Sequence, residues 1–537
     1  MKKSQIMAIG LAVMLTTPTF AAENKDYGKA RGTFDAAQKS VYRASALCPD
    51  TDCAADRPVK AAASGKAKST QWRAREFLLK NEAVDIGNRL KITAREHQPI
   101  IGIGYGTHFW AEVIPRLPPS IYRYMLEDSN TQVIRLKLNE KVESYKGNFI
   151  FENDPYVNFA IEAKARNKRI KFLAAGVKHP QWLLEEVLRN IERKNGEQGP
   201  IMEGEWKTPE SRSRETFINE YSRHILEHFK YYRSIGIEIW GYSQIEPNVS
   251  RIALPEYIKH TNCEKANKVY LTPELHMQLF IKLRSRLDNN GFSAVKLVFP
   301  TASSINKTLD YLDTAVDAYG KEKVRKTIDH ISTNNFSVSP KKMRLWRKLE
   351  NYVESNFPSK KIIGNAIGDL SRDGLKPGME SGLDLFEYFY QPMENNVSLW
   401  NYVFGLKPDT GASGLIGFNK EGTDFGLTDR YRVFSLIAGL VPQRSTRLGI
   451  SMHMHDRNIK ALAFKTKDND ISALIMNRSE EVKHITLNLG RHPDVKSLAS
   501  ITVTGDSVRV KNLGYNKNLL IKLPAMSVTG VTSLQVK

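Results

Sequence analysis

The sequence predicts an α/β protein: a (β/α)8 TIM barrel with an appended antiparallel β-sandwich. Two features of the 537 residues indicate this fold class. Between residues 99 and 441, apolar strand-like runs alternate with amphipathic helical segments, which is typical of right-handed βαβ units in a parallel sheet. After residue 441 the helical segments stop and short alternating strands follow one another, which is typical of a sandwich.

Eight apolar runs are expected to form the barrel, because eight strands spaced by whole helices favour a closed barrel over an open sheet. They are Ile100–Gly104, Val133–Leu138, Ile170–Ala174, Ile237–Ser243, Val295–Phe299, His330–Asn334, Lys361–Ile367 and Val397–Phe404. The helices between them include Tyr156–Ala165, Glu215–Ser234, Pro273–Asn289, Leu309–Tyr319 and Gly382–Met393.

The sandwich is expected to take its strands from both ends of the chain. Residues 85–98 precede the barrel and contain one strand-like run, Leu90–Thr93. Residues 442–537 contain the others, which are Lys460–Phe464, Ser472–Asn477, His484–Leu489, Ser500–Val503, Val508–Val510, Leu519–Leu523 and Ser527–Leu534. No internal repeat of 20–50 residues is visible, which argues against a solenoid.

The N-terminus is typical of an exported protein. Lys2 and Lys3 precede an apolar run, and Thr19-Phe20-Ala21 forms a small-x-small cleavage pattern, so residues 1–21 are expected to be a signal peptide. Residues 22–84 are rich in Ala, Lys and Ser and are expected to form a basic arm or linker. We find no apolar stretch long enough for a transmembrane segment. The expected location is therefore the periplasm or the extracellular space.

The charge balance of the chain indicates what kind of partner it binds. The formal net charge of +21 favours a polyanion, and an exported protein rarely meets nucleic acid. The expected partner is therefore a polysaccharide with acidic groups, although a generally basic protein with scattered lysines would show the same excess. Cys48 and Cys53 close a short loop of turn-forming residues, which in an oxidising compartment predicts a disulfide.

Glu246 is the sharpest candidate for chemistry. It follows the fourth expected barrel strand, and Pro247 stops strand pairing directly after it. In barrels the chemistry lies at the carboxyl ends of the strands. Burial there would raise the pKa of Glu246, which suits a general acid. The alternative is a structural Glu at a strand end.

Gln244-Ile245-Glu246-Pro247 resembles the acid/base motif of glycoside hydrolase family 30 and its clan of retaining (β/α)8 glycosidases. Other segments are similar to the family in the same order: residues 98–106, 133–136, 174–182, 427–442, 475–477 and 523–529. The resemblance covers about residues 85–537 and implies Glu246 as the general acid/base.

The departures from the family concern the catalytic pair. Ile245 stands where the clan normally has Asn, and Ala366 stands at the position that the resemblance assigns to the nucleophilic Glu. An alanine cannot attack a sugar carbon. Asp369 is the nearest substitute and could serve as the base of an inverting pair, which requires a wider carboxyl separation. It could equally be a turn or helix-capping residue.

Other polar and aromatic residues at expected strand ends are candidates for substrate binding. They are Arg135, Lys178, His179, Trp182, Tyr242, Asn334 and Trp110. Arg135 could instead orient Glu246, and Trp182 could simply be packed. His453 and His455 have no third partner, and the glycines at 102–106 lack a dinucleotide-binding layout, so we expect neither a metal nor another cofactor.

Three functions remain open. The first is a glycan-cleaving enzyme that uses Glu246, either for hydrolysis or for β-elimination on a uronate polysaccharide, which needs no second carboxylate nucleophile. The second is a glycan-binding pseudoenzyme that lacks the nucleophile because of Ala366. The third is an envelope protein that docks on an anionic surface.

Overall fold

The computed structural model describes residues 88–107, 110–186, 212–247, 271–336, 340–369, 378–408, 413–453, 456–490, 497–505, 507–514 and 516–535. The predicted signal peptide, the arm at residues 22–84 and the predicted Cys48–Cys53 disulfide lie outside these ranges, as do His108 and Phe109. Within them, no helix is long and apolar enough to cross a membrane.

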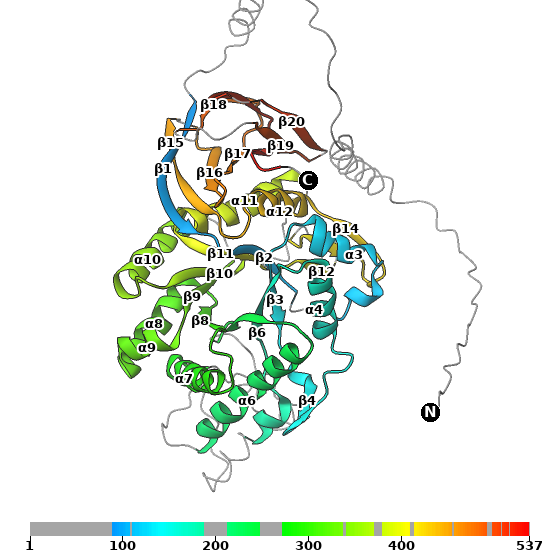
Figure 1. The fold of residues 1–537 in the computed structure, drawn as a ribbon, viewed down its shortest axis with the longest axis vertical. Helices are drawn as coiled ribbons and strands as arrows, with labels where there is room; N and C mark the ends of the chain where they lie inside the picture. Colours follow the sequence, from blue (N-terminus) through cyan, green and yellow to red (C-terminus); the bar gives the residue numbers. More distant parts are fainter. Residues whose placement is uncertain are drawn as a thin grey trace, which may run out of the picture. The chain divides into compact units, whose positions relative to one another are not determined.

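The described residues contain a closed barrel of eight parallel strands, which confirms the predicted fold class (Figure 1). In chain order the strands are β2 (Gly102–Gly106), β3 (Val133–Lys137), β6 (Lys171–Gly176), β7 (Ile239–Gln244), β8 (Lys296–Ala302), β9 (His330–Asn335), β10 (Lys361–Ile367) and β11 (Val397–Tyr402). Each predicted run contributes one strand, with shifts of a few residues at the ends. We call them barrel strands one to eight where the order matters.

Inside the barrel, one layer of apolar side chains fills the space between the strands. It consists of Val133, Leu173, Val298, Ile363 and Leu399. Because successive side chains of a strand point to opposite faces, these residues identify the inward positions, and their neighbours in sequence point to the surrounding helices.

The helices around the barrel are α4 (Pro155–Arg166), α6 (Arg212–Ser234), α7 (Pro273–Asn289), α8 (Ile305–Tyr319), α9 (Lys321–Thr327), α10 (Pro340–Asn356), α11 (Met379–Glu394) and α12 (Asp429–Leu440). Shorter turns, η1 (Ile114–Arg116), α3 (Ser120–Arg123), η2 (Tyr124–Asp128) and η3 (Glu140–Val142), follow the first two barrel strands. Side-chain caps begin several helices: Asp154 accepts from the backbone of α4, Thr272 from α7 and Thr428 from α12. Such caps satisfy backbone donors that a helix start leaves unpaired.

Two small sheets lie in the loops after barrel strands two and eight. A hairpin of β4 (Glu143–Tyr145) and β5 (Asn148–Phe149) follows strand two. A three-stranded sheet of β12 (Leu406–Pro408), β13 (Ile416–Phe418) and β14 (Phe425–Leu427) follows strand eight. Neither was predicted, because strands of two or three residues give no periodic signal.

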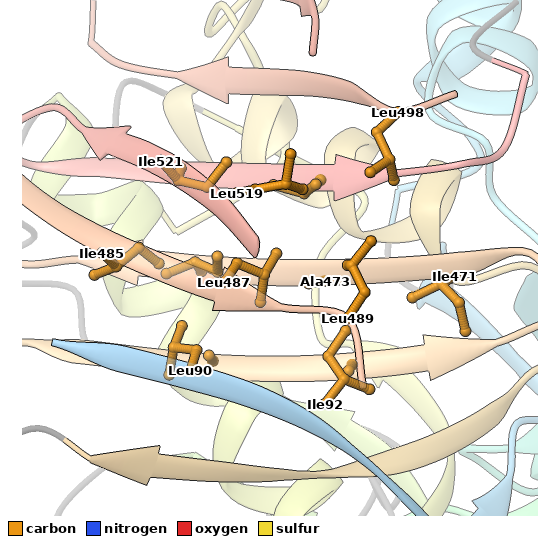
Figure 2. Packing of buried hydrophobic residues seen from close by; sticks show 14 of the residues in the cluster. Leu90, Ile92, Ile471, Ala473, Ile485, Leu487, Leu489, Leu498, Leu519 and Ile521 are labelled. Carbon is orange, nitrogen blue, oxygen red and sulfur yellow. The ribbon is translucent and has the colours of Figure 1, made fainter. Parts of the chain in front are cut away.

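The second domain is one nine-stranded sheet that folds over its own core, as the sandwich prediction requires. Its order is β20 (Val508–Asn512), β19 (Ala499–Val503), β22 (Ser527–Thr532), β17 (Ile471–Asn477), β16 (Ile459–Lys465), β15 (Thr446–His453), β1 (Arg89–Pro99), β18 (Lys483–Asn488) and β21 (Asn518–Leu523). Leu90 and Ile92 of β1 share the buried core with Ile485 and Leu487 of β18 (Figure 2). The pairing of β1 with β18 is parallel, whereas the sequence predicted only antiparallel pairs.

Helices α11 and α12 contact both the barrel strands and the sandwich strands (Figure 1). Lys460 of β16 forms an ion pair with Glu387 of α11, and Arg447 of β15 lies 2.9 Å from Glu394. Gly530 of β22 allows the closest approach, since a Cβ there would lie 2.2 Å from Leu440 Cδ1. Helices α11 and α12 therefore form one packed interface with the sandwich.

Candidate active site

Glu246 lies two residues beyond the end of barrel strand four, and its backbone is held from both sides. The N–H of Ile245 donates to the Gly176 carbonyl at 2.8 Å, and the N–H of Glu246 donates to the Thr301 carbonyl at 3.0 Å. Glu246 has a φ of +46°, a left-handed conformation that is costly for a residue other than glycine. Strained residues of this kind cluster at functional sites, so the conformation supports a role for this side chain.

The carboxylate of Glu246 is half-buried and accepts a hydrogen bond from Asn334, whose Nδ2 lies 3.1 Å from Oε1. Asn334 belongs to β9, barrel strand six. Burial raises the pKa of Glu246, and this effect outweighs the opposing influence of the Asn334 hydrogen bond and the Arg135 charge. A carboxyl with a raised pKa keeps its proton to higher pH, which is what a general acid requires.

Arg135 lies on β3 and has 0% exposed surface. Its guanidinium donates to the carbonyls of Asn365 at 2.6 Å and Val403 at 3.4 Å. Burial lowers the pKa of Arg135 to about 9, while the nearby Glu246 opposes this change. Arg135 has no exposed surface in this position, and its charge acts on Glu246. Of its two predicted roles, this placement favours an electrostatic influence on Glu246.

Ala366 lies on β10, barrel strand seven, and is 2% exposed. The register between β9 and β10 slips at Asn365, so that Gly364 pairs with Thr333 and Ala366 pairs with Asn334. Residues in register on neighbouring strands point to the same face. Ala366 therefore faces the same way as Asn334, the residue that holds Glu246, and it places a methyl group there.

Asn365, the extra residue of this bulge, was not predicted. Its Nδ2 donates to Ser243 Oγ at 2.9 Å, which links barrel strands seven and four inside the barrel. Bulges often lie near active sites, where they aim a side chain. Here the bulge returns Ala366 to the face of Asn334.

Asp369 follows strand seven but belongs to a different set of contacts. Its Oδ2 lies 4.0 Å from a guanidinium nitrogen of Arg430, on α12. Arg430 is buried and also donates to Ser381 of α11 at 2.6 Å and to the hydroxyl of Tyr402. Asp369 therefore lies beside a buried cation of the last barrel helix.

Three predicted binding residues line one cavity of about 520 Å³ at the loops after barrel strands two and three. They are Lys178, His179 and Trp182, and the cavity is also lined by Glu140, Lys141, Glu143, Ser144, Gln181, Leu184 and Glu185. Lys178 is exposed, so its ammonium group reaches solvent. The loops thus bring together cationic, acidic and aromatic groups.

His179 and Trp182 are both buried in the wall of this cavity. The His179 ring packs edge-on against Tyr221 at 4.3 Å, and burial lowers its pKa to about 3, so the imidazole is neutral. Neither ring nitrogen of His179, nor the indole nitrogen of Trp182, has a hydrogen-bond partner among the described residues. These nitrogen atoms are themselves buried, so the two rings shape the wall of the cavity.

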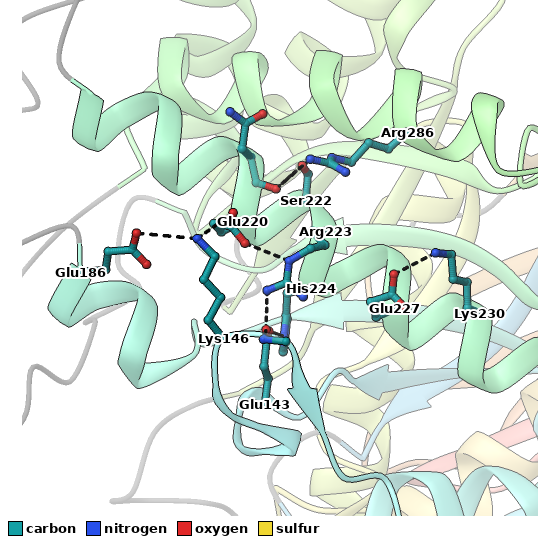
Figure 3. Close-up of polar contacts among 12 residues, drawn as sticks. Glu143, Lys146, Glu186, Glu220, Ser222, Arg223, His224, Glu227, Lys230 and Arg286 are labelled. Carbon is teal, nitrogen blue, oxygen red and sulfur yellow. Dashed lines mark hydrogen bonds and ion pairs between the residues drawn. The ribbon is translucent and has the colours of Figure 1, made fainter.

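A buried cluster of hydrogen bonds around Glu143, which the sequence did not predict, fixes one wall of the cavity (Figure 3). Glu143 of β4 lies 2.8 Å from Nδ1 of His224 on α6, and it also accepts from Arg223 and from the Gly147 N–H. Burial alone would raise the pKa of Glu143, but the three hydrogen bonds lower it. The hairpin is thereby fastened to α6. The two residues are 81 positions apart, and the sequence holds no signal that connects them.

Tyr242 and Trp110 lie away from Glu246 in the contacts described. Tyr242 has 0% exposed surface and packs between Phe229 of α6 and Phe280 of α7 at 6.3 and 6.0 Å, with its hydroxyl donating to Gln244 at 2.8 Å. Tyr242 is therefore packed between the barrel strand and two outer helices. Trp110 is half-buried and packs edge-on against Phe418 of β13 at 5.7 Å.

Within the ranges that the structure describes, no group of three or more His, Cys, Asp or Glu side chains could hold a metal ion.

Comparison with known proteins identifies the second domain. Residues 445–529 match the family model of the glycosyl hydrolase family 30 beta sandwich domain. The C-terminal domain is of the family 30 type. Comparison with curated protein sequences gives no match.

The whole fold is also similar to that of solved family 30 structures. A family 30 endoxylanase from Clostridium papyrosolvens matches with a TM-score of 0.60 and 14% identity, over 83% of this chain and 99% of that one. The catalytic domain of family 30 xylanase C from Talaromyces cellulolyticus matches with a TM-score of 0.62, 14% identity and the same shares. A conserved exported protein from Bacteroides fragilis matches with a TM-score of 0.63 and 13% identity, over 83% of this chain and 100% of that one. The chain therefore has a family 30-like fold, in which an eight-stranded barrel carries the sandwich.

Proposed function

We propose that the protein cleaves glycosidic bonds of a polysaccharide and that Glu246 is the residue that transfers the proton. The observation that carries this proposal is the setting of Glu246. It lies on a strained, doubly held backbone at the end of barrel strand four, with a raised pKa and a hydrogen bond from Asn334. The family 30-like fold supports the same assignment, since its similar structures include two xylanases.

In this proposal Glu246 donates its proton to the oxygen that leaves the sugar. Asn334 orients the carboxyl group, and Arg135 stabilises the carboxylate that remains after the transfer. Arg135 acts from within the barrel, so it is a positioning and electrostatic residue. Proton donation by a placed acid typically accelerates a reaction by about 10²–10⁴-fold.

Ala366 determines which chemistry can follow. Retaining hydrolysis needs a carboxylate about 5–5.5 Å from the acid, and a methyl group cannot form a glycosyl-enzyme bond. Two routes need no such nucleophile. Water can attack directly, with Asp369 or another group as base, or a uronate polysaccharide can undergo β-elimination, in which one group takes the proton beside the sugar carboxylate.

The proposed substrate is anionic. The net charge of +21 supports this, since an excess of cations attracts a chain of carboxylates. The cavity itself has Lys141 and Lys178 beside Glu140, Glu143 and Glu185, so the support comes from the charge of the chain as a whole. His179 and Trp182 would form part of the wall of the cavity that holds this polymer. We further propose that the protein is exported, on the basis of Lys2, Lys3 and the apolar run that follows.

Ala366 also favours a second function, which is glycan binding without cleavage. In that case the cavity beside strands two and three binds sugar while the catalytic pair stays incomplete. One experiment separates these functions. The mature chain is incubated with acidic and neutral polysaccharides, and products are measured as new reducing ends and as ultraviolet absorbance of unsaturated uronate. We expect products from an acidic polymer. Binding without products from any polymer would leave the binding function in place of the enzyme.

A further inference from the structure

One face of the sandwich collects basic side chains from four adjacent strands. In β1, Leu90 and Ile92 point into the core, whereas Arg89 and Lys91 alternate with them and are exposed. β1 is flanked by β15 on one side and by β18 on the other, and β18 is flanked by β21. The side chains that point outward from these strands therefore form one continuous surface.

The register defines this surface, which we call the basic sheet face. Its ten residues are Arg89, Lys91, Ser451, His453, His484, Thr486, Asn488, Asn518, Leu520 and Lys522. Arg89 pairs with His453 and Thr486, Lys91 pairs with Ser451 and Asn488, and His484 pairs with Lys522. Thr486 and Asn488 in turn pair with Leu520 and Asn518. The face thus presents three cations, two imidazoles and several amide and hydroxyl groups, with no carboxylate among the ten.

The spacing of the three cations suits an extended polyanion. Alternate residues of a strand are about 7 Å apart and adjacent strands about 4.8 Å apart. Arg89 and Lys91 therefore lie about 7 Å from each other, and Lys522 lies roughly 12 Å from Arg89, two strands away. Asn488 donates to Asn518 at 2.6 Å, so the amides between the cations form a short ladder.

None of Arg89, Lys91 and Lys522 has an ion-pair partner within the part of the chain that the structure describes. On α8 and α9, by contrast, Lys307 lies 3.2 Å from Asp310 and Lys326 lies 3.5 Å from Glu322. Ion pairing within the described residues therefore does not account for the three cations of the basic sheet face.

Protection of a sheet edge does not explain the face either. Lysines on edge strands prevent pairing with other chains, and β21 is an edge strand, so this accounts for Lys522. Arg89 and Lys91, however, lie on β1, which is paired on both sides. Two of the three cations therefore need another reason.

We propose that the basic sheet face is a docking surface for an acidic polysaccharide. Charge complementarity selects a polyanion, and the hydroxyl and amide groups between the cations fit the neutral hydroxyls of a sugar chain. The face carries no Phe, Tyr or Trp ring on which nucleic-acid bases could stack and only one exposed apolar side chain, Leu520, for insertion into a membrane. The choice of polymer rests on the proposed function. The docking surface would hold the polymer that the barrel cleaves.

The test compares two triple variants in a Glu246→Gln background, so that the polymer is not consumed. Arg89→Gln/Lys91→Gln/Lys522→Gln removes the cations of the face. Lys307→Gln/Lys321→Gln/Lys326→Gln removes the same charge from α8 and α9, where all three lysines are partnered. Binding to polygalacturonate is measured by calorimetry at low and moderate salt, with dextran as the neutral probe. Circular dichroism checks that both variants fold.

We expect the face variant to bind polygalacturonate about tenfold more weakly, equivalent to about 1.4 kcal/mol, and to lose part of the salt dependence. The helix variant should bind within about twofold of the parent. Equal weakening in both variants would show a net-charge effect and overturn the proposal, and so would unchanged binding in the face variant. If the face variant loses more affinity for a DNA oligonucleotide or for anionic vesicles than for polygalacturonate, the choice of an acidic polysaccharide as partner is overturned.

This test is separate from that of the proposed function. If the wild-type chain cleaves no polymer but the face variant binds polygalacturonate more weakly, the docking surface stands and the enzyme proposal fails. If the wild-type chain cleaves the polymer and the face variant binds it normally, the enzyme proposal stands and the docking surface fails.

Discussion

Removing one buried imidazole should make the protein less sensitive to acid. His276 lies on α7, behind the barrel wall, with its ring 4.6 Å from Phe299 and 4.7 Å from Phe280. Neither of its ring nitrogens has a hydrogen-bond partner among the described residues. Burial lowers the pKa of His276 to about 3. Phe299 belongs to β8, the strand that also carries Thr301 and so holds the backbone of Glu246.

The sign and size of the effect follow from proton linkage. In the unfolded chain the imidazole takes up a proton below pH 6.5, whereas in the folded chain it stays neutral down to about pH 3. The unfolded state therefore binds more protons in this window, and the free energy of unfolding falls as the pH falls, by about 1.4 kcal/mol per pH unit for one group. Between pH 6.5 and pH 4.5 the contribution of His276 is ~2 kcal/mol.

The assay is urea unfolding at several pH values between 4.5 and 7. His276→Leu keeps an apolar side chain of similar size and should reduce the pH dependence of the unfolding free energy by about 1.4 kcal/mol per pH unit below pH 6. Phe280→Leu is the matched control, since it disturbs the same packing without removing a titrating group, and it should lower stability equally at every pH. A His276→Leu variant with the wild-type pH dependence would refute the buried neutral imidazole.

The remaining predictions concern the site itself. Asn334→Ala removes a hydrogen bond that lowers the pKa of Glu246, so the alkaline limb of the pH–rate profile should move to higher pH; a limb that stays in place would exclude Asn334 as a positioning residue. Ala366→Glu places a second carboxyl on the face of Asn334, and we expect hydrolysis with retained anomeric configuration by NMR, whereas the absence of any new product would contradict the strand-seven position. Arg135→Met deletes a buried cation bonded to two carbonyls, and urea unfolding should show a loss of about 3–5 kcal/mol, which a loss under ~1 kcal/mol would contradict.

The fold could be predicted because each barrel strand is a short apolar run and each run is separated from the next by a helix. Parallel strands in a barrel are buried on both faces, so their sequences are apolar throughout and easily found. The same property explains why the direction of the Tyr242 side chain could not be predicted. When both faces of a strand are buried, the sequence does not distinguish an inward side chain from an outward one. Tyr242 points to α6 and α7, while its neighbour Ser243 points inward and accepts from Asn365.

The candidate site could be predicted only as far as single positions. Pro247 after an apolar run located Glu246 at a strand end. Its hydrogen bond with Asn334 depends on the register of β7, β8 and β9 and on the shift between Pro300 and Ala302, which no local pattern encodes. Arg135 was predicted as a residue near the site, but its complete burial depends on how the barrel closes around it. Asp369 follows strand seven as predicted, yet its partner Arg430 lies 61 positions later.

The most direct measurement of the central claim is product formation by wild type and Glu246→Gln on the same acidic polysaccharide. The two side chains have nearly the same shape, but the amide cannot donate an acid's proton. We predict that Glu246→Gln lowers kcat by about 10²–10⁴-fold. We also predict that it unfolds no more easily than wild type at pH 7, because burial raises the pKa of Glu246 and so disfavours its charged form. A folded Glu246→Gln variant that cleaves the polymer at the wild-type rate would contradict the claim.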